Sequence, residues 1–150
     1  MPRIFKLDLI VPQEAIDEFG HVNNQRYIAW MQEVATAHSA ANGWPMERYL
    51  EIGAAWVVRS HFIEYLRPAF PGDKIEIFTW AANLALREVA RGYLFRNADD
   101  RRILARAETK WVYVDIKSGR PRRVPEELLS AFEAVPQNDA ELKTLLGPLG

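Results

Sequence analysis

The chain has 150 residues, of which 49% are hydrophobic, and this is the size and composition of one globular domain. Its 19 basic and 20 acidic residues give a formal charge of -1, so no overall positive field would attract nucleic acid or an anionic membrane. The sequence contains no cysteine, which excludes disulfides, a thiol nucleophile and thiolate metal sites. We therefore expect a single cytoplasmic domain over residues 1–150.

The first half of the chain predicts one strand and one long helix. Apolar positions alternate over residues 4–11, as expected of a strand. Asn23 and Asn24 are good helix caps, and apolar side chains then recur every three or four residues as far as the stop at residues 42–43. A shorter helical or irregular piece is expected over residues 45–52.

The second half of the chain predicts four strands followed by a helix. The strands are expected over residues 54–66, 74–84, 86–97 and 102–116, because the apolar period is two and turn residues divide them. Both faces of the first of these strands look largely covered. Pro125 and the two acids after it suit a first helical turn. This order indicates an α+β fold with one antiparallel sheet packed on one helix, and with a tail beyond Pro136 that is either loose or used in contacts.

The polar stretch just before the long helix is the most informative part of the chain. Residues 17–24 read Asp-Glu-Phe-Gly-His-Val-Asn-Asn, which places a carboxylate, an imidazole and two amides at the positive end of a helix. Unpaired backbone N–H groups there could hold an oxyanion, so the stretch could be an acyl-transfer site. The plain alternative is that Asn23 or Asn24 caps the helix, Asp17 forms a loop turn and His21 packs against the core.

The motif Asp-x-x-Gly-His-Val-Asn-Asn, followed by Tyr27 and Trp30, resembles the signature of the hot-dog-fold thioesterases, in the branch of bacterial acyl-CoA and 4-hydroxybenzoyl-CoA thioesterases. It is also similar to that of plant acyl-carrier-protein thioesterases. Residues 62–73, with an Arg-Pro pair and a Gly-Asp turn, and residues 120–125 add to the resemblance. The resemblance covers residues 5–133 and implies a hot-dog fold, in which a five-stranded antiparallel sheet wraps a long central helix.

The resemblance implies catalytic roles for the residues of this motif. Asp17 occupies the place of the family's catalytic carboxylate, which would attack the thioester carbonyl or deprotonate a water. Backbone N–H groups near Asn23 and Asn24 would hold the carbonyl oxygen. His21 would orient Asp17 or a water, or make a structural hydrogen bond, and Gly20 would permit the close approach.

The resemblance also implies an acyl-CoA substrate, with an acyl-carrier protein as the alternative carrier, and sites at the interfaces of a homodimer or homotetramer. Tyr27 would begin the helix face near the acyl group, or pack in the core. Arginine side chains suit the phosphates of CoA, although the ordinary role of each is that of a solvated surface residue. The candidates are Arg59, Arg87, Arg91, Arg120, Arg122 and Arg123, of which we single out Arg59, Arg122 and Arg123 for the site. No cofactor and no metal are expected.

Two departures from the family pattern leave alternatives open. Phe19 stands where the plant enzymes have an asparagine, so the bacterial acyl-CoA branch fits better. A second thioesterase branch takes its carboxylate from the central helix, where Glu33 is the only acid, although Glu33 could simply be a polar helix position or pair with Arg26 or His38. Hydration or dehydration of an enoyl thioester and non-catalytic acyl binding are the alternative functions. The acyl group could be aliphatic or aryl.

Overall fold

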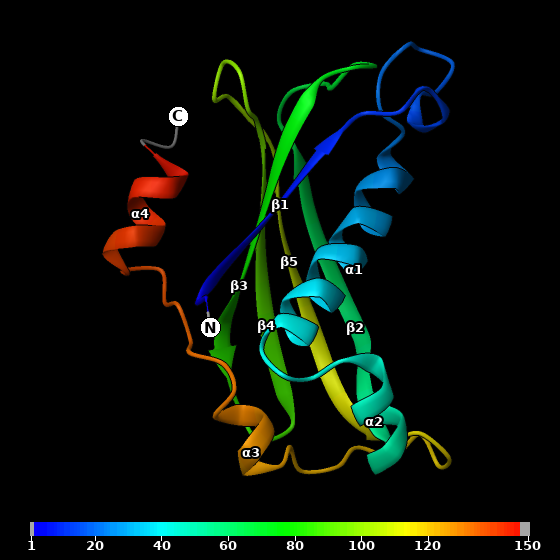
Figure 1. The fold of residues 1–150 in the computed structure, drawn as a ribbon, viewed down its shortest axis with the longest axis vertical. Helices are drawn as coiled ribbons and strands as arrows, with labels where there is room; N and C mark the ends of the chain where they lie inside the picture. Colours follow the sequence, from blue (N-terminus) through cyan, green and yellow to red (C-terminus); the bar gives the residue numbers. More distant parts are fainter. Residues whose placement is uncertain (1, 148–150) are drawn as a thin grey trace.

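The computed structural model describes residues 2–147, which form one five-stranded antiparallel sheet and four α-helices (Figure 1). The strands lie in the order β1-β3-β4-β5-β2. Their bounds are β1 Ile4–Ile10, β2 Ala54–Tyr65, β3 Lys74–Leu84, β4 Glu88–Asn97 and β5 Ile103–Asp115. The helices are α1 Asn24–Ala41, α2 Met46–Ile52, α3 Glu126–Leu129 and α4 Ala140–Leu146, with a 3-10 turn η1 at Gln13–Ala15. The predicted long helix on a five-stranded antiparallel sheet is confirmed.

The sequence of α1 explains its position against the sheet. The side-chain oxygen of Asn23 caps the helix by accepting the N–H of Gln25 at 2.9 Å. Tyr27, Met31 and Val34 recur at helical spacing and are buried toward the sheet. They form the main core with the residues of β3, β4 and β5 that point to the same face, and this core fixes α1 along the sheet.

The opposite face of the sheet carries a second apolar cluster, which the C-terminal segment covers. Its buried members are Phe78, Trp80, Leu94, Val135 and Leu142. Gly92 on β4 has no side chain because the Trp80 ring lies over it, where an added Cβ would come within 2.4 Å of the ring. The tail beyond Pro136 was expected to be either loose or used in contacts. As far as residue 147, it is used in contacts.

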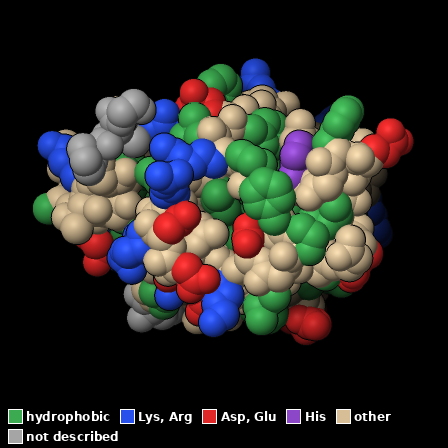
Figure 2. All heavy atoms as spheres, turned by 90° about the horizontal axis from the view of Figure 1, so that it is seen from above, with side chains coloured by type: hydrophobic (Ala, Val, Ile, Leu, Met, Phe, Trp, Pro, Cys, Tyr) green, Lys and Arg blue, Asp and Glu red, His purple; other side chains and the backbone are tan. Residues whose placement is uncertain are grey.

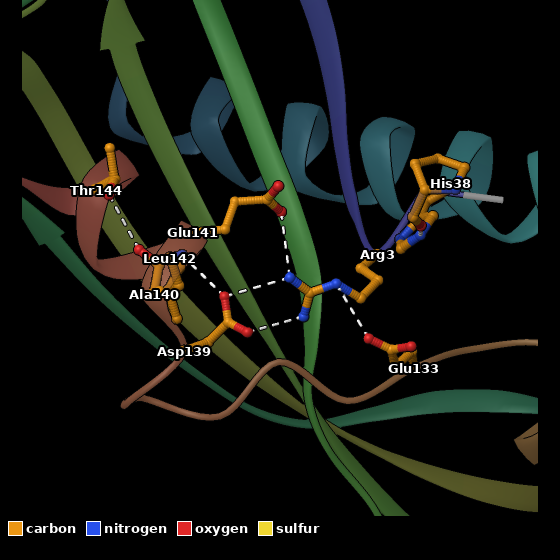
Figure 3. Close-up of polar contacts among 9 residues, drawn as sticks. Arg3, His38, Glu133, Asp139, Ala140, Glu141, Leu142 and Thr144 are labelled. Carbon is orange, nitrogen blue, oxygen red and sulfur yellow. Dashed lines mark hydrogen bonds and ion pairs between the residues drawn. The ribbon is translucent and has the colours of Figure 1, made fainter.

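Ion pairs of Arg3 hold this C-terminal segment to the start of β1, as Figure 3 shows. The guanidinium lies 2.9 Å from Asp139, 3.1 Å from Glu133 and 3.5 Å from Glu141. Asp139 also caps α4 by accepting the N–H of Leu142 at 3.1 Å. The start of β1 and the start of α4 therefore lie together.

The expectation that both faces of β2 are covered is wrong. β2 is at the edge of the sheet and pairs with β5 alone, because residues 66–73 carry the chain across to β3 on the far side. Val57, Phe62 and Tyr65 are exposed, and Phe62 reaches 65%. An apolar pattern predicts a strand but not which neighbour covers it, so the sequence did not predict this exposed edge.

Candidate active site at the start of α1

The loop before α1 is closed by short contacts of its own backbone. Ile16 and Val22 form an isolated antiparallel bridge, and the N–H of Asp17 donates to the carbonyl of His21 at 2.9 Å. Gly20 lies in this turn with a φ of 84°, a left-handed conformation that glycine adopts without strain. The turn brings Asp17 beside His21 directly before the helix.

The Asp17 carboxylate has one oxygen fixed by the backbone and one available for chemistry. Its Oδ1 accepts the N–H groups of Phe19 at 2.9 Å and His21 at 3.4 Å. Its Oδ2 lies 3.7 Å from Nδ1 of His21 and has no hydrogen bond within residues 2–147. The side chain is 22% exposed, so a water or a substrate can reach it.

The helix start offers one backbone N–H to an incoming oxyanion. The N–H of Asn23 donates to the carbonyl of Ala15 at 2.9 Å, and the Asn23 side chain is engaged as the cap. Within residues 2–147, the N–H of Asn24 has no partner. Of the two amides suggested by the sequence, only that of Asn24 is therefore free to bind a carbonyl oxygen.

Two tyrosines pack beside this helix start. Tyr27 is buried, its ring meets that of Tyr65 edge-on at 5.3 Å, and burial raises its pKa to about 12, so the phenol stays protonated. Tyr65 at the end of β2 donates its hydroxyl to the carbonyl of Asn24 at 3.2 Å. Sequence reasoning did not include Tyr65 in the site, because only the pairing of β2 with β5 brings it to α1.

The surface arginines lie apart from this loop within the single chain. Arg122 pairs with Asp115 at 3.7 Å, and it and the exposed Arg123 follow β5 at the opposite end of the sheet (Figure 1). Arg59 on β2 is exposed and pairs with Glu88 at 2.7 Å. The fold of a single chain therefore does not bring Asp17 together with the candidate phosphate-binding arginines.

The other sequence candidates are accounted for as follows. Glu33 is exposed on α1 and makes no ion pair with Arg26 or His38 within the described residues. His38 is instead buried, and it bonds Arg91 and the carbonyl of Pro2.

Residues 2–147 contain no group of three His, Asp or Glu side chains that could hold a metal ion. None of their helices is long and apolar enough to cross a membrane.

Apolar side chains gather on the surface at the end of the molecule that carries the Asp17 loop (Figure 2). The large exposed hydrophobic residues in the segments at this end include Ile10, Phe19, Tyr65, Leu66 and Phe70. Such a surface beside a carboxylate could bind an acyl group or a second subunit.

A cavity lies at the other end of α1, lined by residues of α1, α2, α3 and all strands except β1, and no residue of the Asp17 loop borders it. Its one charged lining residue is Arg91, which is only 8% exposed, so the sequence-based view of Arg91 as a surface residue is wrong. The sequence does hold a signal: Val89, Tyr93 and Phe95 alternate with Arg91 on the face of β4 that turns to the core.

The comparisons with known proteins decide the family. The model of the thioesterase-like superfamily matches residues 11–132. The chain belongs to this superfamily. The thioesterase-like chain is 25% identical to the acyl-CoA thioester hydrolase YbgC of Escherichia coli over 130 residues, which are 87% of this chain and 96% of YbgC.

Two further relatives are more distant or shorter matches. A palmitoyl-acyl carrier protein thioesterase from chloroplasts of Cuphea hookeriana is 30% identical over 78 residues, which are 52% of this chain but only 19% of that longer protein. A solved 1,4-dihydroxy-2-naphthoyl-CoA thioesterase from Synechocystis superposes with a TM-score of 0.79 at 18% identity, covering 85% of this chain and 94% of the other. The thioesterase-like chain thus has the hot-dog fold that the family resemblance implied.

Proposed function

We propose that this protein hydrolyses an acyl-CoA thioester, with Asp17 as its catalytic carboxylate. The observation that carries the proposal is the Asp17 loop, in which, among residues 2–147, Oδ2 has no hydrogen bond and the turn leads directly to the unpaired N–H of Asn24. A carboxylate beside an unpaired helix start is the minimum equipment for acyl transfer to water. The named acyl-CoA hydrolase among the relatives supports the same substrate class.

The chemistry follows from these groups. The thioester carbonyl oxygen accepts the N–H of Asn24, and the positive helix end stabilises the negative charge that develops there. In one route Oδ2 of Asp17 takes a proton from water, the hydroxide attacks the carbonyl carbon, and the C–S bond breaks. CoA leaves as a thiolate and recovers that proton. In the other route Oδ2 attacks the carbon itself, and the C–S bond breaks to release the CoA thiolate and leave an anhydride on Asp17. Water then hydrolyses the anhydride, which frees the acid, restores the Asp17 carboxylate and supplies the proton that the thiolate takes up. Both routes give a carboxylic acid and a thiol.

The site is completed in a homodimer formed through β2. The exposed edge of β2, with Val57 and Phe62, can pair with the same strand of a second copy. A two-fold axis through the middle of β2 reverses the partner's direction. It carries Arg122 of the partner subunit and Arg123 of the partner subunit toward the Asp17 end, where CoA phosphates would lie.

Assays with different substrates are needed to identify the preferred acyl group and the preferred carrier. Exposed phenylalanine side chains near the loop can contact aliphatic and aryl groups alike, and a relative that acts on an acyl-carrier protein keeps that carrier as the alternative to CoA. We place the reaction in the cytoplasm, which suits a chain without cysteine.

The proposal is tested by thiol release from short, medium, long and aryl acyl-CoA substrates. The protein has no cysteine, so a thiol reagent reads only released CoA. Asp17→Asn keeps an oxygen for the Phe19 N–H but removes the base or nucleophile, so we expect kcat to fall about a hundredfold or more. The neighbouring exposed Glu18→Gln should stay within about twofold. Hydration of an enoyl-CoA without thiol release, or tight binding without turnover, would contradict the proposal.

A further inference from the structure

The cavity at the far end of α1 is large enough for a small organic molecule. Its volume is about 120 Å³, and an engineered apolar cavity of about 150 Å³ binds benzene. Trp44, Trp56 and Trp111 supply much of its aromatic wall. Thr36 and Met46 are the exposed members of the lining, so its mouth lies between α1 and α2.

Arg91 brings a buried positive charge to this cavity without a counter-ion. Its Nη1 donates to Nδ1 of His38 at 2.8 Å and to the hydroxyl of Thr79 at 3.2 Å. Within residues 2–147 no carboxylate pairs with Arg91, and its Nε and Nη2 have no hydrogen-bond partner. Arginine is seldom buried unless it is paired, because removing a charge from water is costly.

The same strand provides a matched comparison. Arg96 on β4 is about as buried as Arg91, but its Nε and Nη2 both lie 2.9 Å from Oε1 of Glu76. Glu76 also pairs with Lys6 at 2.6 Å. Glu76 thus neutralises Arg96, whereas the corresponding Nε and Nη2 of Arg91 have no partner within residues 2–147.

His38 does not neutralise Arg91 either. Arginine has only donors, so Nδ1 of His38 must accept, and its Nε2 carries the hydrogen that goes to the carbonyl of Pro2 at 2.9 Å. Burial, and next the charge of Arg91, lower the pKa of His38 to about 4, so it is neutral near pH 7. Of the other polar lining groups, the Tyr49 hydroxyl bonds Ser39 at 2.8 Å, whereas the buried indole N–H of Trp111 has no partner within residues 2–147.

We propose that this cavity is a second ligand site, separate from the Asp17 loop, which binds a small carboxylic acid with an apolar or aryl body. The planar carboxylate would take the open Nε and Nη2 fork of Arg91. The body of the acid would lie against the tryptophans. A singly charged carboxylate matches the single guanidinium, and the apolar wall disfavours a multiply charged phosphate.

Binding is tested by tryptophan fluorescence titration with benzoate and hexanoate, beside the uncharged benzamide and hexanamide. We expect the acids to bind about tenfold or more tightly than their amides, because charge-assisted hydrogen bonds are the stronger ones. Equal affinity of acid and amide would overturn the proposal. Displacement of benzoate by an equal concentration of sodium chloride would also overturn the proposal. It would show that the site binds any anion and that the apolar part of the acid adds no affinity.

Variants locate the site. Arg91→Gln should remove the preference for the acid over the amide, whereas Arg96→Gln should leave it unchanged. Ala35→Leu fills the cavity from α1 and leaves Arg91 unchanged in the sequence, so it should abolish binding of the acids and the amides alike. This variant tests the site even if Arg91→Gln fails to fold. Wild-type binding by Ala35→Leu would overturn the proposal. Asp17→Asn should bind benzoate like wild type, so failure of the hydrolase proposal would not affect this result.

Discussion

His38 makes the stability of the fold depend on pH. Its pKa is about 4 in the folded chain, against 6.5 for an ordinary histidine, through burial and then the charge of Arg91. Between these values the unfolded chain binds a proton that the folded chain does not. The free energy of unfolding should therefore fall by about 2 to 3 kcal/mol as the pH is lowered from about 6.5 to 4.

Urea unfolding across this pH range measures the effect. His38→Gln offers an oxygen to Arg91 and an amide to the carbonyl of Pro2 but does not titrate, so its stability should change less between pH 6.5 and 4.5. Burial alone would raise the pKa of Glu76, but Lys6 and Arg96 hold it below its ordinary value, so Glu76 contributes at lower pH. A His38→Gln curve as steep as that of wild type would show that another group causes the loss.

For single residues, the sequence identified candidate site residues better than it predicted the surroundings of each side chain. The motif around Asp17 could be found because its residues are consecutive, and the loop contacts itself. The environment of Arg91 depends on α1, β3 and β4 meeting, so a solvated arginine was the natural expectation. Asn23 and Asn24 could not be distinguished either, because the partner of the Asn23 N–H is the carbonyl of Ala15 across the loop.

Among the elements, α4 matters because it covers the outer face of the sheet. Leu142 is 2% exposed against Phe78 and Trp80, while the neighbouring Lys143 points to solvent. Leu142→Ala should lower the free energy of unfolding by about 2 kcal/mol, and Lys143→Ala by less than about 0.5 kcal/mol. Urea unfolding of both variants is the measurement. Equal stability of the two would mean that α4 does not pack there in solution.

The elements themselves were largely readable from the sequence. Caps and periodicity located α1 and the four later strands, because these signals are local. The helix α4 was not predicted, although Asp139 is a good cap, because its apolar positions become informative only when the sheet surface beneath them is known. The short turn η1 was not predicted either.

For the whole molecule, the exposed edge of β2 predicts the assembly. Phe62→Lys places a charge in the proposed dimer interface and should convert a dimer into a monomer at micromolar concentration, as measured by light scattering after gel filtration. Leu86 in the turn between β3 and β4 is also exposed, and β5 separates β4 from β2, so Leu86→Lys should leave the mass unchanged. A monomeric wild type would contradict the shared site.

The order of the strands in the sheet could not be predicted from the sequence, because it depends on contacts between distant segments. β2 and β3 are separated by a short loop with strong turn residues, yet they lie in non-adjacent positions of the sheet. A period-two pattern specifies that a strand forms and which side chains share a face, but not the neighbour it selects. The resemblance to a known family supplied the five-stranded sheet around the helix.

The most direct test of the account compares two carboxylates in one assay. Asp17 and Glu33 represent the two places from which thioesterases of this fold are expected to take their acid, the loop before α1 and α1 itself. We predict that Asp17→Asn lowers kcat for the best acyl-CoA substrate about a hundredfold or more, while Glu33→Gln stays within about threefold of wild type. The reverse result, with full activity in Asp17→Asn and a collapse in Glu33→Gln, would contradict the central claim.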